Sequence, residues 1–152
     1  MIILDDKLLR VKEKMHSSNY KLTPQRELVL RVLMENEHNH LNADDIYLLV
    51  KEIAPDLGLA TVYRTLELLS DLKIVQKLHF GDSVTRYEFS SADDSHHHHH
   101  LICIKCGKVE EINEDWLGFI EEKVEKEYDF EIIDHRLIFQ GFCKECRHLS
   151  KN

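Results

Sequence analysis

The stretch NADDIYLLVKEIAPDLGLATVYRTLELLSD, residues 42–71, contains two helical patterns joined by a short turn. In the first pattern, Asn42 is a helix-capping residue type, acidic residues follow in the first turn, and apolar residues recur at helical spacing. The Pro and Gly within residues 55–58 predict a turn. The second pattern runs from about residue 60 to residue 71. Two helices joined by a short Gly-containing turn predict a helix-turn-helix.

Elements on either side of this pair extend the prediction to a whole domain. The spacing of apolar residues predicts earlier helices over residues 6–16 and 24–35, the second with Pro at its first position. The β-rich residues 74–80 and 84–89 enclose a Gly-Asp turn and predict a hairpin. Helices followed by a hairpin are the element order of a winged helix-turn-helix.

The second half of the chain contains shorter elements. We predict strands at 101–102, 108–112 and 130–139 and an amphipathic helix at 114–127. In that helix, Leu117, Ile120 and Val124 are expected to face inward. A module of this size cannot bury a large core alone, so we expect metal binding and dimerisation to brace it.

Together these patterns predict an α+β chain with two domains. A winged-helix DNA-binding domain is expected at residues 1–90, and the polar, acidic residues 91–95 are expected to form a linker. A small α/β metal-binding dimerisation domain is expected at residues 96–152. Hydrophobic residues make up 43% of the chain, which is enough for a packed core and excludes a disordered chain.

The net charge of −8 is unusual for a DNA-binding protein, but the charges are unevenly distributed. Residues 91–152 carry eight basic and fourteen acidic side chains, whereas residues 10–31 carry six basic and two acidic ones. Because DNA affinity depends on local phosphate contacts, one basic face is sufficient for an acidic protein to bind DNA. The acidic remainder opposes tight binding unless cations neutralise part of it.

The sequence contains no signal for export or membrane insertion. No apolar run approaches the roughly 20 residues that span a bilayer. The first six residues, MIILDD, lack the basic start and long apolar stretch of a signal peptide. We therefore expect a cytoplasmic protein without a membrane partner.

All four cysteines fall in two Cys-x-x-Cys pairs, Cys103 with Cys106 and Cys143 with Cys146. Four thiolates around one Zn²⁺ form the usual closed structural site, so we predict structural zinc. Two thiol pairs or disulfides without metal are the alternative, although disulfides are rare in the cytoplasm. Such a closed site has no open coordination position for catalysis.

Five consecutive histidines, residues 96–100, lead directly into the first cysteine pair. A purification tag or a solvated polar loop would also explain the run, but a tag is normally terminal and longer. If the run is extended, alternate side chains point to opposite faces, so one strand can serve two metal sites. Other candidate donors near the proposed domain boundary are His40, His79, Glu88, Glu110, Glu111 and His135.

The motifs together resemble those of the ferric uptake regulator family over nearly the whole chain. The residues that carry the resemblance are Tyr20-Lys21-Leu22-Thr23-Pro24-Gln25-Arg26, Gly58-Leu59-Ala60-Thr61-Val62-Tyr63-Arg64-Thr65-Leu66, the His run through Leu101-Ile102-Cys103-x-x-Cys106-Gly107, and Asp134-His135-Arg136-Leu137. The resemblance implies a homodimeric repressor that uses Fe²⁺ as corepressor, with Mn²⁺ or Zn²⁺ as substitutes, on palindromic, A/T-rich double-stranded operator DNA.

The resemblance also implies two further metal sites. The interdomain regulatory site would consist of His40, Glu88, His98, His100 and Glu111. Glu rather than Asp at position 111 resembles the iron sensors of the family more than its peroxide sensors.

The second implied site matches His97, His99, Gly118 and His135, where His replaces the family's Asp and Gly offers no ligand. Glu121 or Glu122, one turn further along the same helix, is the expected replacement. We take the set as His97, His99, Glu122 and His135.

The second helix of the helix-turn-helix is expected to enter the major groove with Ala60, Thr61, Tyr63 and Arg64 near the DNA. The resemblance likewise implicates Tyr63 and Arg64, although Tyr63 could instead be a core aromatic residue. Lys21 and Arg26 are expected to contact backbone phosphates or to be ordinary solvated charges. Arg86, in the predicted wing, is a further candidate.

Several functions other than iron sensing remain open from the sequence. A zinc-, manganese-, nickel- or peroxide-sensing member of the same family fits the same motifs. A metal storage or delivery protein would explain the His run but not the helix-turn-helix. An enzyme is disfavoured because no nucleophile–base constellation and no Gly-rich phosphate loop are present, and because protein ligands saturate the metal sites.

Overall fold

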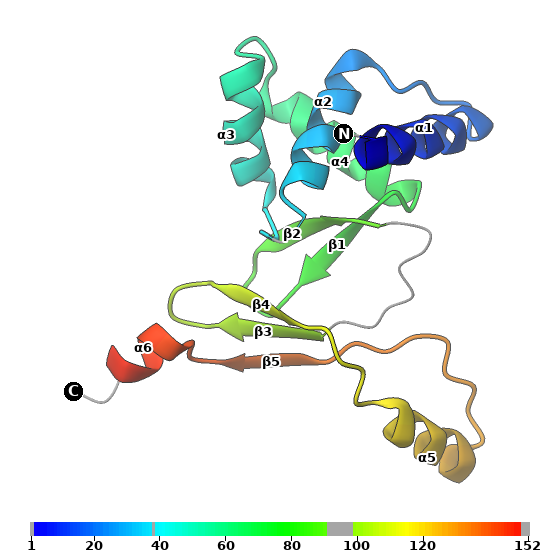
Figure 1. Cartoon of the computed structure of the whole chain (residues 1–152), viewed down its shortest axis with the longest axis vertical. Coiled ribbons are helices and arrows are strands. Elements are labelled where there is room, and N and C mark those ends of the chain that lie inside the picture. Colours follow the sequence, from blue (N-terminus) through cyan, green and yellow to red (C-terminus); the bar gives the residue numbers. More distant parts are fainter. Residues whose placement is uncertain (1, 38, 91–98, 150–152) are drawn as a thin grey trace. The chain divides into compact units, whose positions relative to one another are not determined.

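The computed structural model describes residues 2–37, 39–90 and 99–149, and it divides the chain into two compact units (Figure 1). The N-terminal unit comprises Met1–Ala92 and the C-terminal unit comprises Asp93–Asn152. The linker expected at residues 91–95 lies outside the described residues.

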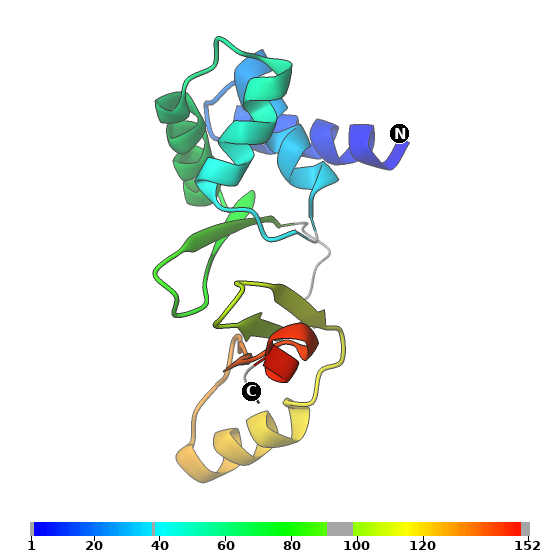
Figure 2. The same cartoon turned by 90° about the vertical axis from the view of Figure 1, so that its left-hand side faces the viewer.

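The N-terminal unit contains four helices followed by a two-stranded antiparallel hairpin (Figure 2). Its elements are α1 (Ile2–Ser17), α2 (Pro24–Glu35), α3 (Ala43–Ile53), α4 (Leu59–Asp71), β1 (Val75–His79) and β2 (Thr85–Phe89). This order is the predicted one, and α1 begins four residues earlier than the sequence pattern indicated. A core of fully buried side chains from all four helices holds the unit together, among them Met15, Leu30, Ile46 and Leu66.

Two polar caps fix where α2 and α3 begin. The Thr23 hydroxyl accepts a hydrogen bond from the backbone N–H of Arg26 at 3.3 Å. Asn42 and Asp45 form a reciprocal capping box, in which each side chain accepts from the backbone N–H of the other residue, at 2.8 and 3.3 Å. Each cap satisfies N–H groups that a helix cannot pair internally. The caps therefore set the start of the helix-turn-helix.

The hairpin is tied to the helical part of the unit by a backbone hydrogen bond from β2 and by an ion pair from β1. The backbone N–H of Tyr87 in β2 donates to the carbonyl of Leu41, just before α3, at 2.8 Å. On β1, the Lys77 ammonium lies 2.6 Å from the Glu67 carboxylate on α4. These contacts hold the hairpin beside α4, as a winged helix-turn-helix requires.

The C-terminal unit is a three-stranded sheet with two helices. Its elements are β3 (His99–Cys103), β4 (Val109–Ile112), α5 (Gly118–Tyr128), β5 (Ile138–Gly141) and α6 (Lys144–Leu149). The strand order is β4-β3-β5, in which β3 pairs antiparallel with β4 and parallel with β5. The strand expected at 130–139 is wrong in extent, because regular pairing begins only at Ile138. The sequence pattern also missed α6.

Few apolar side chains of the C-terminal unit are buried. Helix α5 buries none of its residues, and the inward placement expected of Ile120 is wrong because this side chain is 52% exposed. Phe119 and Ile133 are 78% and 94% exposed. The unit therefore presents an apolar surface of the kind that a protein partner covers. Among the described residues, no helix combines the length and apolar character needed to cross a membrane.

The capping box yields a direct test of the helix-turn-helix. Replacement Asn42→Ala removes the cap of α3 and should lower the free energy of unfolding of the N-terminal unit by about 1 kcal/mol. Chemical denaturation followed by circular dichroism measures this change. The Asn42→Asp variant retains a capping side chain and should match the parent. Equal stability of the Ala variant and the parent would show that the cap does not hold α3.

Candidate metal centres

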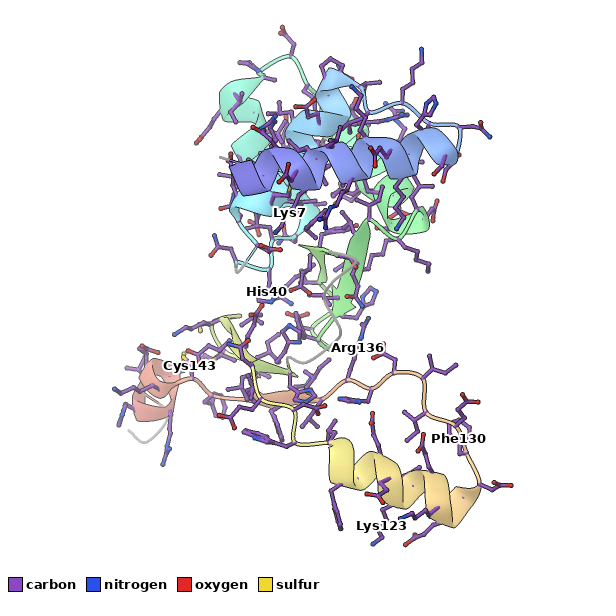
Figure 3. All side chains as sticks on the ribbon, turned by 45° about the vertical axis from the view of Figure 1, so that its right-hand side comes forward. Lys7, His40, Lys123, Phe130, Arg136 and Cys143 are labelled. Carbon is purple, nitrogen blue, oxygen red and sulfur yellow. The ribbon has the colours of Figure 1, made fainter. Side chains whose placement is uncertain are left out.

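The four cysteines converge at one end of the sheet of the C-terminal unit. The parallel pairing of β3 with β5 places Cys103 opposite Gly141, so the two Cys-x-x-Cys turns lie side by side. Gly107 closes the first turn with a positive φ of 77°, and its N–H donates to the carbonyl of Cys103 at 2.9 Å. Cys143 follows β5, as labelled in Figure 3, and Cys146 lies in α6.

The geometry of the sulfurs fits a tetrahedral metal site. All four Sγ atoms lie within 4.8 Å of one another, and those of Cys106 and Cys143 are 3.7 Å apart. Zn–S bonds of about 2.3 Å in a tetrahedron require S···S separations of about 3.8 Å. All four cysteines are free thiols, so the disulfide alternative has no support in the structure.

The electrostatics of the thiols favours a bound cation. Backbone N–H groups, that of Cys106 above all and then that of Cys143, lower the pKa of the Cys103 thiol to about 6. Burial, together with hydrogen bonds to its neighbouring cysteines, raises the pKa of Cys146 to about 12. Backbone hydrogen bonds therefore favour a thiolate at Cys103, whereas burial opposes ionisation of Cys146. A divalent cation such as Zn²⁺ would supply the charge that the remaining thiols need to ionise.

A second cluster in the same unit joins three elements of the chain. The Asp115 carboxylate, between β4 and α5, lies 3.5 Å from Nε2 of His99 and 3.3 Å from Nε2 of His135. The Glu121 carboxylate of α5 contacts Nδ1 of His135. One donor atom each of His99, Asp115 and His135 lies within 4.8 Å of the others. Two imidazoles and two carboxylates are a donor set that first-row divalent metals accept.

The burial of His99 and the lowered pKa of Asp115 suit this second cluster to bind a cation. His99 is 2% exposed, and neither of its ring nitrogens has a hydrogen-bond partner within the described part of the chain. The backbone N–H of Leu117 donates to Asp115 at 3.0 Å and is the main cause of the lowered pKa of that carboxyl. The lowered pKa favours an ionised Asp115, whose carboxylate lies beside the buried His99 imidazole.

The ligand set differs from the one expected from the sequence. Glu122 points to the exposed side of α5, where its carboxylate lies 2.6 Å from the Lys126 ammonium, whereas Glu121 reaches His135. Asp115 was missed, because nothing in its local sequence distinguishes it from other acidic residues. A Cβ added at Gly118 would meet no atom within 4 Å, so space exists where the residue offers no ligand. His97 lies outside the described residues.

The residues expected in the regulatory site form one donor pair in each unit. In the N-terminal unit, donor atoms of His40 and Glu88 lie within 4.8 Å of each other, and the His40 and Phe80 rings form a T-shaped pair with 6.3 Å between centroids. In the C-terminal unit, His100 stands opposite Glu111 across β3 and β4, also with donor atoms within 4.8 Å. His98 lies outside the described residues.

The two remaining candidate donors, His79 and Glu110, lie elsewhere. His79 ends β1 and borders a groove of about 550 Å³ between α4 and the hairpin. Glu110 is exposed and pairs with Lys108 at 2.8 Å. Neither belongs to a cluster of metal donors among the described residues.

Helix α4 presents the side chains expected to read DNA. Val62, Thr65 and Leu66 are buried, whereas Tyr63 and Arg64 are exposed. Tyr63 is 42% exposed, so the alternative of a core aromatic residue does not hold. Thr61 is half-buried and Ala60 is exposed at the start of the same helix.

The other residues expected to contact DNA differ in their exposure and in their contacts within the protein. Lys21 is exposed, and its carbonyl accepts a hydrogen bond from the Arg26 guanidinium at 2.7 Å, which braces the loop before α2. Arg86 was a candidate DNA contact in the wing. Its guanidinium instead pairs with Asp82 at 2.8 Å and lies 5.3 Å from the Phe80 ring centroid. The Arg86 pairing holds the pKa of Asp82 below its usual range.

Comparison with known proteins identifies the family. A profile of the Ferric uptake regulator family matches residues 17–140. The chain belongs to the ferric uptake regulator family. The Ferric uptake regulation protein of Bacillus subtilis is 55% identical over 143 residues, which are 94% of this chain and 96% of that protein. The Peroxide-responsive repressor PerR of Staphylococcus epidermidis is 33% identical over 95% of this chain and 93% of its own length.

Solved structures of the family have the same architecture. The ferric uptake regulator Fur of Helicobacter pylori, which has three functional metal binding sites, superposes with a TM-score of 0.82 at 28% identity, over 95% of this chain and 93% of that one. The ferric uptake regulator of Vibrio cholerae gives a TM-score of 0.75 at 31% identity, over 87% and 98%. The predicted family and α+β fold class, a winged helix-turn-helix followed by a small dimerisation domain, are confirmed.

The cysteine cluster yields a metal-removal test. We expect Cys106→Ser to weaken zinc binding by more than about 100-fold, because even a residue that only orients a ligand costs 10- to 100-fold when it is lost. Zinc competition with a chromophoric chelator, followed by elemental analysis, measures this loss. The Lys105→Ser variant changes the same turn without removing a sulfur and should retain zinc. Full zinc retention in the Cys variant would exclude the four-sulfur site.

Adjacent residues on α5 provide a matched test of the second cluster. In the zinc-loaded protein, Glu121→Gln should weaken binding of one further Mn²⁺ by about tenfold or more, whereas Glu122→Gln should leave it unchanged. Electron paramagnetic resonance of free Mn²⁺ during a titration measures the difference. If the Glu122 variant loses the ion and the Glu121 variant retains it, the sequence-based ligand set is right and this cluster is wrongly assigned.

Proposed function

We propose that this family member is an Fe²⁺-dependent repressor that binds operator DNA as a homodimer and controls genes of iron uptake. The observation that carries the proposal is the division of His and Glu donors into two pairs, His40 with Glu88 in one unit and His100 with Glu111 in the other. A metal that needs both pairs, completed by His98, binds only when the two units meet. Metal occupancy would thereby control their relative orientation.

The charge of the donors explains why a cation would bring the pairs together. Glu88 and Glu111 repel each other when brought into one site, and neutral imidazoles do not offset that repulsion. Fe²⁺ supplies two positive charges and accepts both imidazole and carboxylate ligands, as Mn²⁺ and Zn²⁺ also do. The identity of 55% to the Ferric uptake regulation protein of Bacillus subtilis, against 33% to a peroxide-responsive repressor, favours iron over peroxide sensing. Glu at position 111 favours the same choice.

The apolar surface of the C-terminal unit supports a homodimer. Aromatic and aliphatic side chains on and around α5 and β5 are largely exposed in the single chain, among them Trp116, Phe119, Phe130, Ile133 and Phe139. Phe130, near α5, is labelled in Figure 3. A twofold interface between two copies of the chain would cover this apolar surface. The dimer would present two copies of α4 to adjacent half-sites of a palindrome.

In this proposal, each α4 reads the major groove of A/T-rich DNA with Thr61, Tyr63 and Arg64. Arg64 would contact guanine or phosphate, and Tyr63 would pack on a thymine methyl group or reach phosphate. Lys21 and Arg26 would bind the backbone nearby. The α4 helices of the two protomers must be spaced about 34 Å apart along the DNA, or a multiple of that. If the two units of each protomer could adopt many relative orientations, this spacing would seldom be met and DNA binding would be weak. Metal would restore affinity by selecting one orientation.

The decisive test is operator affinity with and without the regulatory metal. For the zinc-loaded parent, anaerobic Fe²⁺ or Mn²⁺ should raise affinity by roughly 10- to 100-fold, the usual range of coupling between two sites. Glu88→Ala, His98→Ala and Glu111→Ala should each abolish most of this response, whereas Glu110→Ala, beside Glu111 on β4, should retain it. Fluorescence anisotropy of labelled palindromic DNA measures the operator affinity of the parent and of each variant, with and without the metal. An equal metal response in parent and ligand variants would reject this site.

A further inference from the structure

A concave pocket of about 320 Å³ lies in the N-terminal unit, between α1 and the turn that joins α4 to β1. Four cationic side chains border it: Lys7, Arg10 and Lys14 from α1 and Lys73 from the turn. Its remaining walls are Val11, Ile74, Phe89 and Ser90, and no carboxylate lines it among the described residues. A pocket of this size, with apolar walls and a few convergent polar groups, has the form of a small-ligand site. We call it the basic pocket.

The spacing along α1 brings the first three cations together. Lys7, Arg10 and Lys14 are three and four residues apart, so they share one face of the helix. Figure 3 labels Lys7 on α1, and its ammonium lies 5.5 Å from the ring centroid of Phe89 in β2. Three positively charged side chains therefore border the pocket from one face of α1.

The fourth cation is held against the same face. Lys73 has a positive φ of 61°, a left-handed conformation that ends the turn after α4. Its carbonyl accepts a hydrogen bond from the Lys14 ammonium at 3.4 Å, which links the two borders of the pocket. Lys7 forms an ion pair with Glu37 at 3.7 Å, but in the part of the chain that the structure describes neither Lys14 nor Lys73 pairs with a carboxylate. Positive charge therefore concentrates here in a chain of net charge −8.

The position of the pocket separates it from the proposed DNA-reading surface. The reading residues Thr61, Tyr63 and Arg64 lie in the first two turns of α4, whereas Lys73 follows the last turn. At 1.5 Å per residue, Thr61 and Asp71, the last residue of α4, are about 15 Å apart along the helix axis. A concave, partly apolar site at that end suits a small molecule better than the regular phosphate backbone of a duplex.

We propose that the basic pocket binds a small multivalent anion bearing phosphate or sulfate groups. Lys14 and Lys73 would donate to its oxygens from opposite borders of the pocket. The bound anion would brace α1 against the turn between α4 and β1. Because the ligand binds only the folded unit, it would also raise the thermal stability of that unit.

The experiment uses the zinc-loaded full chain with hydrogen phosphate and sulfate as probes, at constant ionic strength set with sodium chloride. We expect saturable chemical-shift changes at the backbone amides of Lys14, Lys73 and Ser90 and a rise in melting temperature. Lys73→Asn, which tolerates the positive φ, and Lys14→Gln should each weaken binding by about fivefold. Lys12→Gln removes an exposed charge of the same helix outside the pocket and should bind as the parent does.

Three outcomes would overturn the proposal. Shifts that do not saturate would mean only general screening by salt. An equal loss of binding in Lys12→Gln would mean that net charge, and not the pocket, attracts the anion. A loss of operator affinity in Lys73→Asn, with no anion binding by the parent, would assign the cations to the DNA backbone instead.

Discussion

The C-terminal unit buries few apolar side chains, and we infer that bound cations stabilise it where hydrophobic packing is weak. Helix α5 buries none of its residues, and both ends of the sheet are defined by polar clusters instead. At one end, four sulfurs converge where β3 and β5 run parallel. At the start of β3, buried His99 meets Asp115 and His135. Each cluster gathers donor groups that a divalent metal accepts, sulfurs in the first and imidazoles with carboxylates in the second.

In the proposed function, metal binding also controls DNA binding, through the orientation of the N-terminal unit. The N-terminal unit has its own core of side chains from four helices, so it needs no metal to hold α4 and the hairpin in place. In the proposed function, what the regulatory ion adds is a fixed relation between this unit and its dimer partner. A donor pair on each unit, His40 with Glu88 and His100 with Glu111, would provide that relation through one ion. Structural stability and regulation would then use separate metal sites, so that loss of the regulatory metal need not unfold the protein.

The sequence predicted the N-terminal unit well because its signals are local. Thr23 and Asn42 fix helix starts, and periodic apolar residues define the helices between them. The C-terminal unit was harder, since the extent of β5 depends on pairing with β3, about 38 residues away in the chain, as in His100 with Ile138. The six-residue α6 has no periodic pattern long enough to detect. Glu121 and Glu122 differ by one residue, or about 100° around the helix, and only the packed structure shows which carboxylate meets His135.

The central claim is that a regulatory divalent ion fixes the two units in one orientation. Small-angle X-ray scattering of the zinc-loaded dimer, recorded with and without Mn²⁺ in the absence of DNA, tests it most directly. The account predicts that Mn²⁺ shrinks the radius of gyration and the maximum dimension, and that the change disappears in Glu88→Ala. Identical scattering with and without Mn²⁺, in a protein shown to have bound the ion, would contradict it.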